Sequence, residues 1–161
     1  MHASSVGLLH LLLLSAAAAQ PATIASCGGA AVFSSLSITP STPLAGVPVN
    51  VTAIGAAQTA VPSAGSYGEI DAFMYQANVF SSPVSACGQN QTIDILGLAS
   101  LTVNALACPL AAGAPAAVSL ALVVPEAAKG LGDVTVIVNT TAASGAIAFC
   151  LNLTVPTFGR R

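Results

Sequence analysis

The fold is decided by the segment Cys108-Pro-Leu-Ala-Ala-Gly-Ala-Pro-Ala-Ala-Val-Ser-Leu-Ala-Leu-Val-Val-Pro125. Its second half has a period of two, in which large apolar side chains alternate with residues such as Ser119 and Ala121. That period is typical of a β-strand with one buried face. Pro125 ends the run, because proline cannot donate a hydrogen bond to a neighbouring strand. We therefore expect a strand whose buried face carries Val118, Leu120, Leu122 and Val124.

The surrounding stretch, Cys87 to Pro125, has a single charged side chain, Asp94. A segment this apolar is buried in protein, inserted in a membrane, or wrapped around something apolar. The part from Leu98 to Val124 is 27 residues without a charge, long enough for a transmembrane helix. Two prolines, Pro109 and Pro115, interrupt it, and a spanning helix would not show the period of two. We therefore favour strands over a helix.

Similar short apolar runs recur along the chain between glycines and prolines. Besides 117–124, the expected strands lie at 32–38, 48–54, 69–80, 92–98, 101–106, 134–139 and 147–155. No helical pattern follows the first twenty residues, and no internal repeat is visible. The pattern indicates an all-β, two-sheet sandwich in one domain.

The run 69–80 does not keep one buried face. Solvent exposure of Glu69 and Asp71 would turn Ile70 inward, whereas exposure of Gln76 and Asn78 would turn Phe73, Tyr75, Ala77 and Val79 inward. One regular strand cannot satisfy both choices. We expect a bulge or two strand pieces near Phe73-Met74.

Residues 1–19 have the features of a secretory signal peptide: an apolar run at 6–14, then Ala17-Ala18-Ala19 before the expected cleavage point. The domain is expected at 20–158 and a basic tail at 159–161. Both histidines, His2 and His10, lie in the signal segment. A mature chain without histidine has no Ser-His-Asp or Cys-His catalysis and no histidine-ligated metal.

Other functional classes are excluded by charge and spacing. Three basic residues in the whole chain make no patch for nucleic acid. The cysteines lack the paired Cys-x-x-Cys spacing of a zinc site, and no cofactor motif is visible. Two-carboxylate catalysis would need Asp94 with Asp133 or Glu69 with Asp71, but residues two apart on a strand are usually just an outer face. We expect neither an enzyme nor a metal protein.

Four cysteines in a secreted chain predict two disulfides, and three pairings are possible. Four Asn-x-Thr sequons are acceptors for N-linked glycans, which would also help to keep so apolar a protein soluble. They begin at Asn50, Asn90, Asn139 and Asn152.

The order of Cys27, Cys87, Cys108-Pro109-Leu110, Pro125 and Cys150 resembles that of the ML lipid-recognition domain, the family of Niemann-Pick type C2 sterol carriers and of phosphatidylglycerol/phosphatidylinositol transfer proteins. The resemblance covers about Cys27 to Pro156. It implies an immunoglobulin-like sandwich that holds one lipid or sterol in an apolar cavity between its sheets, without catalytic residues. It also implies the disulfides Cys27–Cys150 and Cys87–Cys108.

The same resemblance suggests the lipid-lining residues, with Phe80 at the pocket and two valines at its mouth. They are Ile70, Phe73, Tyr75, Phe80, Val118, Leu120, Leu122, Val123 and Val124. A polar contact at the mouth could come from Asp94, Glu69 or Tyr75. The expected protein is secreted or lies in an endosomal, lysosomal or vacuolar lumen, and contacts a membrane or membrane protein transiently during transfer. The alternative is a secreted adhesion or interaction module with a fully packed interior.

Overall fold

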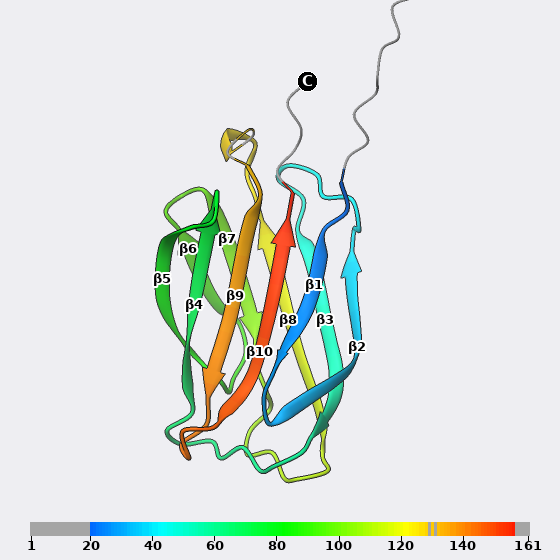
Figure 1. Ribbon diagram of the computed structural model, residues 1–161, viewed down its shortest axis with the longest axis vertical. Helices are drawn as coiled ribbons and strands as arrows, with labels where there is room; N and C mark the ends of the chain where they lie inside the picture. Colours follow the sequence, from blue (N-terminus) through cyan, green and yellow to red (C-terminus); the bar gives the residue numbers. More distant parts are fainter. Residues whose placement is uncertain (1–19, 129, 131, 157–161) are drawn as a thin grey trace, which may run out of the picture.

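The computed structural model describes residues 20–128, 130 and 132–156. The predicted signal peptide (1–19) and basic tail (159–161) lie outside the described residues. The described part is a sandwich of two antiparallel five-stranded sheets (Figure 1). Its helical structure is a single 3-10 turn, η1 (Glu126–Ala128). The all-β expectation is thus confirmed.

The first sheet has the order β1-β10-β9-β4-β5. Its strands are β1 (Thr23–Gly28), β10 (Ile147–Val155), β9 (Val134–Thr141), β4 (Tyr67–Met74) and β5 (Ala77–Ser85). The second sheet has the order β2-β3-β8-β7-β6. Its strands are β2 (Ala31–Thr39), β3 (Val49–Ala57), β8 (Pro115–Val123), β7 (Ala99–Asn104) and β6 (Gln91–Ile95).

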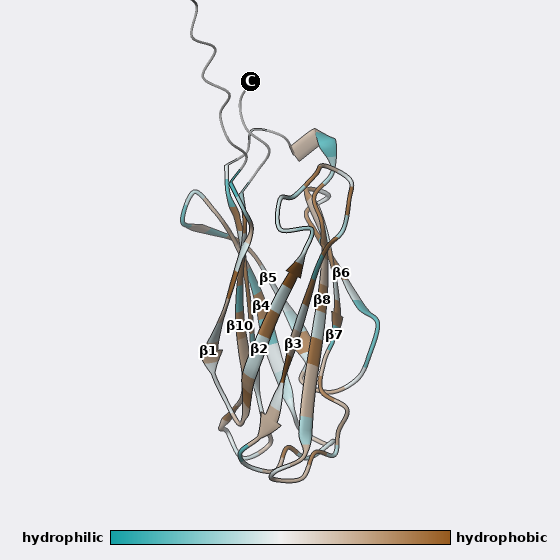
Figure 2. Cartoon of the chain, turned by 90° about the vertical axis from the view of Figure 1, so that its right-hand side faces the viewer, coloured by the Kyte–Doolittle hydropathy of each residue, from teal (hydrophilic) through white to brown (hydrophobic). Residues whose placement is uncertain are grey.

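The predicted strand at 117–124 is the central strand of the second sheet, β8. It pairs with β3 on one side and β7 on the other. Its alternate residues Val118, Leu120 and Leu122 are buried against the first sheet, as the period of two predicted. Figure 2 shows the resulting bands of hydropathy along the strand. The stretch considered for a membrane helix forms β7 and β8 instead, and no helix in the described residues has the length and hydropathy of a membrane span.

The interior is built almost entirely from aliphatic side chains. Its one fully buried aromatic residue among those described is Phe149, whose ring meets that of Phe33 edge-on with 6.4 Å between centroids. Buried polar side chains are few and satisfied: Thr140, fully buried, donates to the carbonyl of Phe149 and accepts from its N–H. No buried side-chain nitrogen or oxygen in the described residues lacks a partner. The interior between the sheets is therefore apolar, and its few polar groups are satisfied within the protein.

The run 69–80 forms two strands, and both features expected near Phe73-Met74 are present. Between β4 and β5, Tyr75 and Gln76 have φ of 51° and 66°. Two positive φ values at a two-residue hairpin loop are those of a type I′ turn. A bulge between Ala72 and Phe73 also shifts the pairing of β4 with β5.

The two lateral edges of the sandwich differ. At one edge only Gly29 and Ala30 separate β1 from β2, so a very short link joins the sheets. At the other edge β5 and β6 end their sheets, and residues 86–90 connect them. Both implied disulfides are present: Cys27–Cys150 fastens β1 to β10, and Cys87–Cys108 fastens the β5–β6 loop to the β7–β8 loop.

Candidate functional site

Five of the nine residues predicted to line a lipid site lie between the sheets. Each is at most 2% exposed: Ile70, Val118, Leu120, Leu122 and Val124. Val124 follows the end of β8, where its carbonyl accepts a hydrogen bond from the N–H of Gly46 in the β2–β3 loop. These residues form part of one apolar cluster that extends through the interior.

Phe80 also faces the interior, but from the edge strand β5. It lies opposite Ala72, which is fully buried, and is itself half-buried against the core. Across the same edge, Ile93 of β6 lies opposite the fully buried Leu101 and is half-buried too. The edge between β5 and β6 therefore presents apolar side chains that point inward yet are partly open to solvent. Ile93 was not among the predicted lining residues, although its alternation with Ile95 signalled an inward face.

Three predicted lining residues face outward, which corrects the expectation for them. Phe73 pairs with Thr135, and the alternate neighbours Val134 and Val136 are the buried ones, so the Phe73 ring lies on the outer face of the first sheet. Tyr75 is 69% exposed because it forms the hairpin turn. Val123 is the half-buried outward neighbour of Leu122. The turn sets the direction of Tyr75 and has no strong local sequence signal, whereas Phe73 and Val123 follow the regular alternation of their strands.

The carboxylates proposed for a polar contact have local partners. The Ser81 hydroxyl lies within hydrogen-bond distance of both Glu69 and Asp71, on the exposed face of the first sheet. Asp94 accepts from the N–H of Gly97, 2.6 Å away, and so closes the β6–β7 turn. No group of three or more metal-ligating side chains occurs in the part of the chain that the structure describes.

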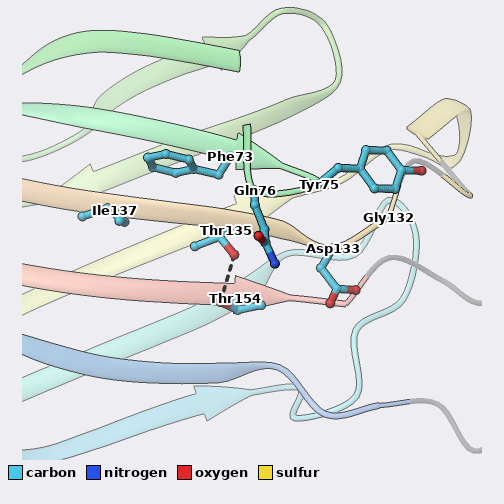
Figure 3. A pocket seen from close by; sticks show the side chains of 8 residues that line it. All are labelled: Phe73, Tyr75, Gln76, Gly132, Asp133, Thr135, Ile137 and Thr154. Atoms are coloured by element: carbon cyan, nitrogen blue, oxygen red, sulfur yellow. Dashed lines mark hydrogen bonds between the residues drawn. The ribbon is translucent and has the colours of Figure 1, made fainter. Parts of the chain in front are cut away.

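An open groove of about 650 Å³ lies on the outer face of the first sheet (Figure 3). The hairpin turn, the segment before β9, and β9 and β10 contribute to it. Its lining residues are Phe73, Tyr75, Gln76, Gly132, Asp133, Thr135, Ile137 and Thr154. The sheet itself separates this groove from the interior, since Val134, Val136 and Val155 are buried on the other face.

The sequon asparagines all lie at the surface. Asn50, Asn90 and Asn139 are exposed, and Asn152 is half-buried on the outer face of β10. Glycosylation at these positions stays a prediction.

Comparison of the sequence finds no matching family profile and no matching curated protein. Comparison of the structure does find relatives. A Niemann-Pick type C2 protein from Japanese carpenter ant matches with a TM-score of 0.57 and 11% identity, over 84% of this chain and 99% of that one. Chicken MD-1 complexed with lipid IVa matches with a TM-score of 0.50 and 16% identity, over 86% of this chain and 90% of that one.

The fold is that of these two proteins. The Niemann-Pick type C2-like sandwich spans both five-stranded sheets, as the resemblance in the sequence had predicted. At such low identity the likeness concerns the backbone arrangement, so the site must be argued from the residues of this chain.

Proposed function

We propose that this protein binds one apolar lipid or sterol between its sheets and carries it through an extracytosolic fluid. The observation that carries the proposal is the edge between β5 and β6, where Phe80 and Ile93 turn inward and remain half-buried. Half-buried apolar side chains also occur at the opposite edge, on β1 and β2, so the edge between β5 and β6 is distinguished by its longer connection between the sheets. The solved chicken MD-1 structure, of the same fold, is a complex with lipid IVa.

The interior supplies the right chemistry for such a ligand. Its described side chains are apolar or satisfied polar groups, so it offers no free hydrogen-bond partner to a polar ligand. An acyl chain needs none, because each buried methylene contributes about 0.8 kcal/mol. Twelve buried methylenes would thus contribute roughly 10 kcal/mol before the cost of parting the sheets.

The asymmetry of the edges suggests where the sheets part. The short Gly29-Ala30 link fixes the distance between β1 and β2, whereas β5 and β6 are joined through the longer loop 86–90. Entry of a lipid there would move β5 away from β6 and leave the strand pairing within each sheet intact. No catalytic residue is needed for binding or release.

Contact with a membrane during transfer is the second part of the proposal. Exposed apolar side chains occur on three loops that Figure 1 shows at one end of the sandwich. These are Leu44 in the β2–β3 loop, Tyr75 in the hairpin turn and Leu96 in the β6–β7 turn, exposed by 58%, 69% and 59%. We define this set as the apolar loop end. Large apolar groups gathered at one end suit insertion between lipid headgroups.

Two disulfides fit an oxidising compartment, either outside the cell or in an endosomal, lysosomal or vacuolar lumen.

The experiment is a titration with cis-parinaric acid, a fatty acid whose fluorescence rises in an apolar site, and with a fluorescent sterol in parallel. We expect wild type to bind at least one of the two probes. Phe80→Asp should weaken binding by about a hundredfold or more, because a carboxylate facing a dry interior costs several kcal/mol. The matched control is Val79→Asp, which places the same charge at the exposed neighbouring position of β5.

Circular dichroism must show that the Phe80→Asp protein is folded. If it is not, Phe80→Ala keeps the test open, with an expected loss of about tenfold from the smaller apolar contact. Equal loss from Val79→Asp would place the site elsewhere. Failure of wild type to bind either probe would favour the alternative, a secreted interaction module without a lipid site.

A further inference from the structure

The groove on the outer face of the first sheet has a chemistry different from that of the interior. It combines the ring of Phe73 with the amide of Gln76, the carboxylate of Asp133 and the hydroxyls of Thr135 and Thr154. The two hydroxyls are hydrogen-bonded to each other at 3.1 Å and form part of the groove floor (Figure 3). An aromatic face beside several hydrogen-bonding groups suits a sugar, whose C–H face packs on a ring while its hydroxyls and amides bond to the polar groups.

One end of the groove is held in place by internal contacts. The Tyr75 hydroxyl donates to the carbonyl of Gly130, 3.2 Å away. Its ring lies directly on Gly132, where an added Cβ would be 2.6 Å from a ring atom. These contacts attach the hairpin turn to the segment that precedes β9. The groove is therefore a preformed hollow and not a gap between independent loops.

A glycosylation sequon runs into this groove. In Asn152-Leu153-Thr154, the threonine is a lining residue. Asn152 lies opposite Ile137, another lining residue, and Thr154 lies opposite Thr135. Leu153 between them is fully buried, so Asn152 and Thr154 both point to the outer face. A glycan on Asn152 would leave the protein at the border of the groove.

The distances allow the glycan to reach the aromatic ring. Phe73 lies on β4, which is separated from β10 by β9. Across the sheet, Phe73 is level with Thr135 and Thr154, and Thr154 is two residues along β10 from Asn152. With about 4.8 Å between strands and about 3.4 Å per residue, the two positions are roughly 12 Å apart. The asparagine side chain and the first two sugars of an N-linked glycan span that distance.

We propose that the outer groove seats the first sugars of an N-linked glycan attached to Asn152. The seated glycan covers Ile137 and Phe73, which are apolar residues of the groove. Asn139 provides a contrast on the same face. It lies opposite Glu69 and Cys150, is not among the lining residues, and its sequon runs away from the groove to Thr141. A glycan on Asn139 is expected to extend freely into solvent.

The test uses the full-length protein secreted from a eukaryotic host. Glycopeptide mass spectrometry first measures occupancy at each sequon, and a glycan must be found on Asn152. The native protein is then treated with an endoglycosidase that cuts within the two-sugar core, and loss of glycan is followed separately at Asn152 and Asn139. We expect cleavage at Asn152 to be about fivefold slower, from a stacking contact of ordinary strength.

Phe73→Ala should abolish this protection at Asn152 and leave the rate at Asn139 unchanged. Asp133→Ala, which leaves the ring in place and creates no new sequon, should reduce the protection partially and serves as the second variant if Phe73→Ala fails to fold. An unoccupied Asn152 would overturn the proposal. Equal cleavage rates at the two sites in wild type, or protection that persists in both folded variants, would also overturn it.

Discussion

Replacement of Thr140 by valine removes a single hydroxyl group from β9. Among the described residues, Thr140 is the polar side chain that is fully buried. The hydroxyl donates to the carbonyl of Phe149 at 3.0 Å and accepts from its N–H at 3.1 Å. It does so where the pairing of β9 with β10 shifts between Ile147 and Phe149, so the side chain gives both backbone groups of Phe149 a partner at this irregularity. Valine has nearly the same shape and would leave no cavity, but it offers neither donor nor acceptor.

The expected destabilisation can be worked out from these contacts. Leaving two buried backbone groups without partners costs about 3 kcal/mol, and the added buried methyl group returns about 0.8 kcal/mol. The free energy of unfolding should therefore fall by about 2 kcal/mol, which for a domain of this size lowers the melting temperature by roughly 8 °C. Position 140 is the middle residue of the Asn139 sequon, so the change leaves that sequon intact.

Urea unfolding followed by circular dichroism measures the effect, with an unchanged slope showing that both proteins unfold from similar states. Thr102→Val is the matched control, because its hydroxyl bonds only to that of Thr92 on the outer face, where water can replace it. That variant should stay within about 0.5 kcal/mol of wild type. A loss for Thr140→Val no larger than this would refute the role assigned to the buried hydroxyl.

Three further predictions concern transfer, packing and pH. The double variant Leu44→Asp and Leu96→Asp at the apolar loop end should slow lipid transfer to vesicles about tenfold or more, while lipid affinity stays within about twofold. Thr42→Asp, at an exposed position in the same loop as Leu44, is the control for charge. Slower transfer in the control alone would argue against insertion. Gly68→Ala should lower the free energy of unfolding in urea by about 3 kcal/mol, since its Cβ would collide with the carbonyl oxygen of Asn139. A wild-type midpoint would contradict that close approach. Lipid affinity, measured by the same probe titration, should change little between about pH 6 and pH 8, because residues 20–156 contain no histidine; a steep change would point to another titrating group.

The sequence predicted the framework of the fold because the determining signals are local or covalent. The alternation at Val118, Leu120 and Leu122 needs only one strand to be recognised, and all three side chains are buried as expected. Four cysteines allow three pairings, and the family resemblance selected the pair found in the structure. The strand β1 was missed, since Thr23–Gly28 is short and mostly exposed and carries no apolar alternation.

Phe73 keeps the alternation set by Ile70 and Ala72, whereas the direction of Tyr75 could not be read from its neighbours. The hairpin turn falls on Tyr75-Gln76, whereas turns of this type usually carry asparagine or glycine at these positions. The bulge beside Phe73 shifts the pairing of β5, where Val79 has no partner on β4, and leaves the alternation along β4 intact. The outer groove was invisible for a different reason: it depends on the register of β4, β9 and β10, which no single segment contains.

The bond between Cys27 and Cys150 joins the first strand of the domain to the last, so everything between them is a closed covalent ring. A protease that cuts one peptide bond in any loop between these cysteines opens the ring but releases no fragment. Strands on both sides of the cut remain tethered within the same two sheets, so the cut pieces can stay assembled. New chain ends could therefore be placed in an exposed loop such as 143–146, with the original ends still held by the disulfide.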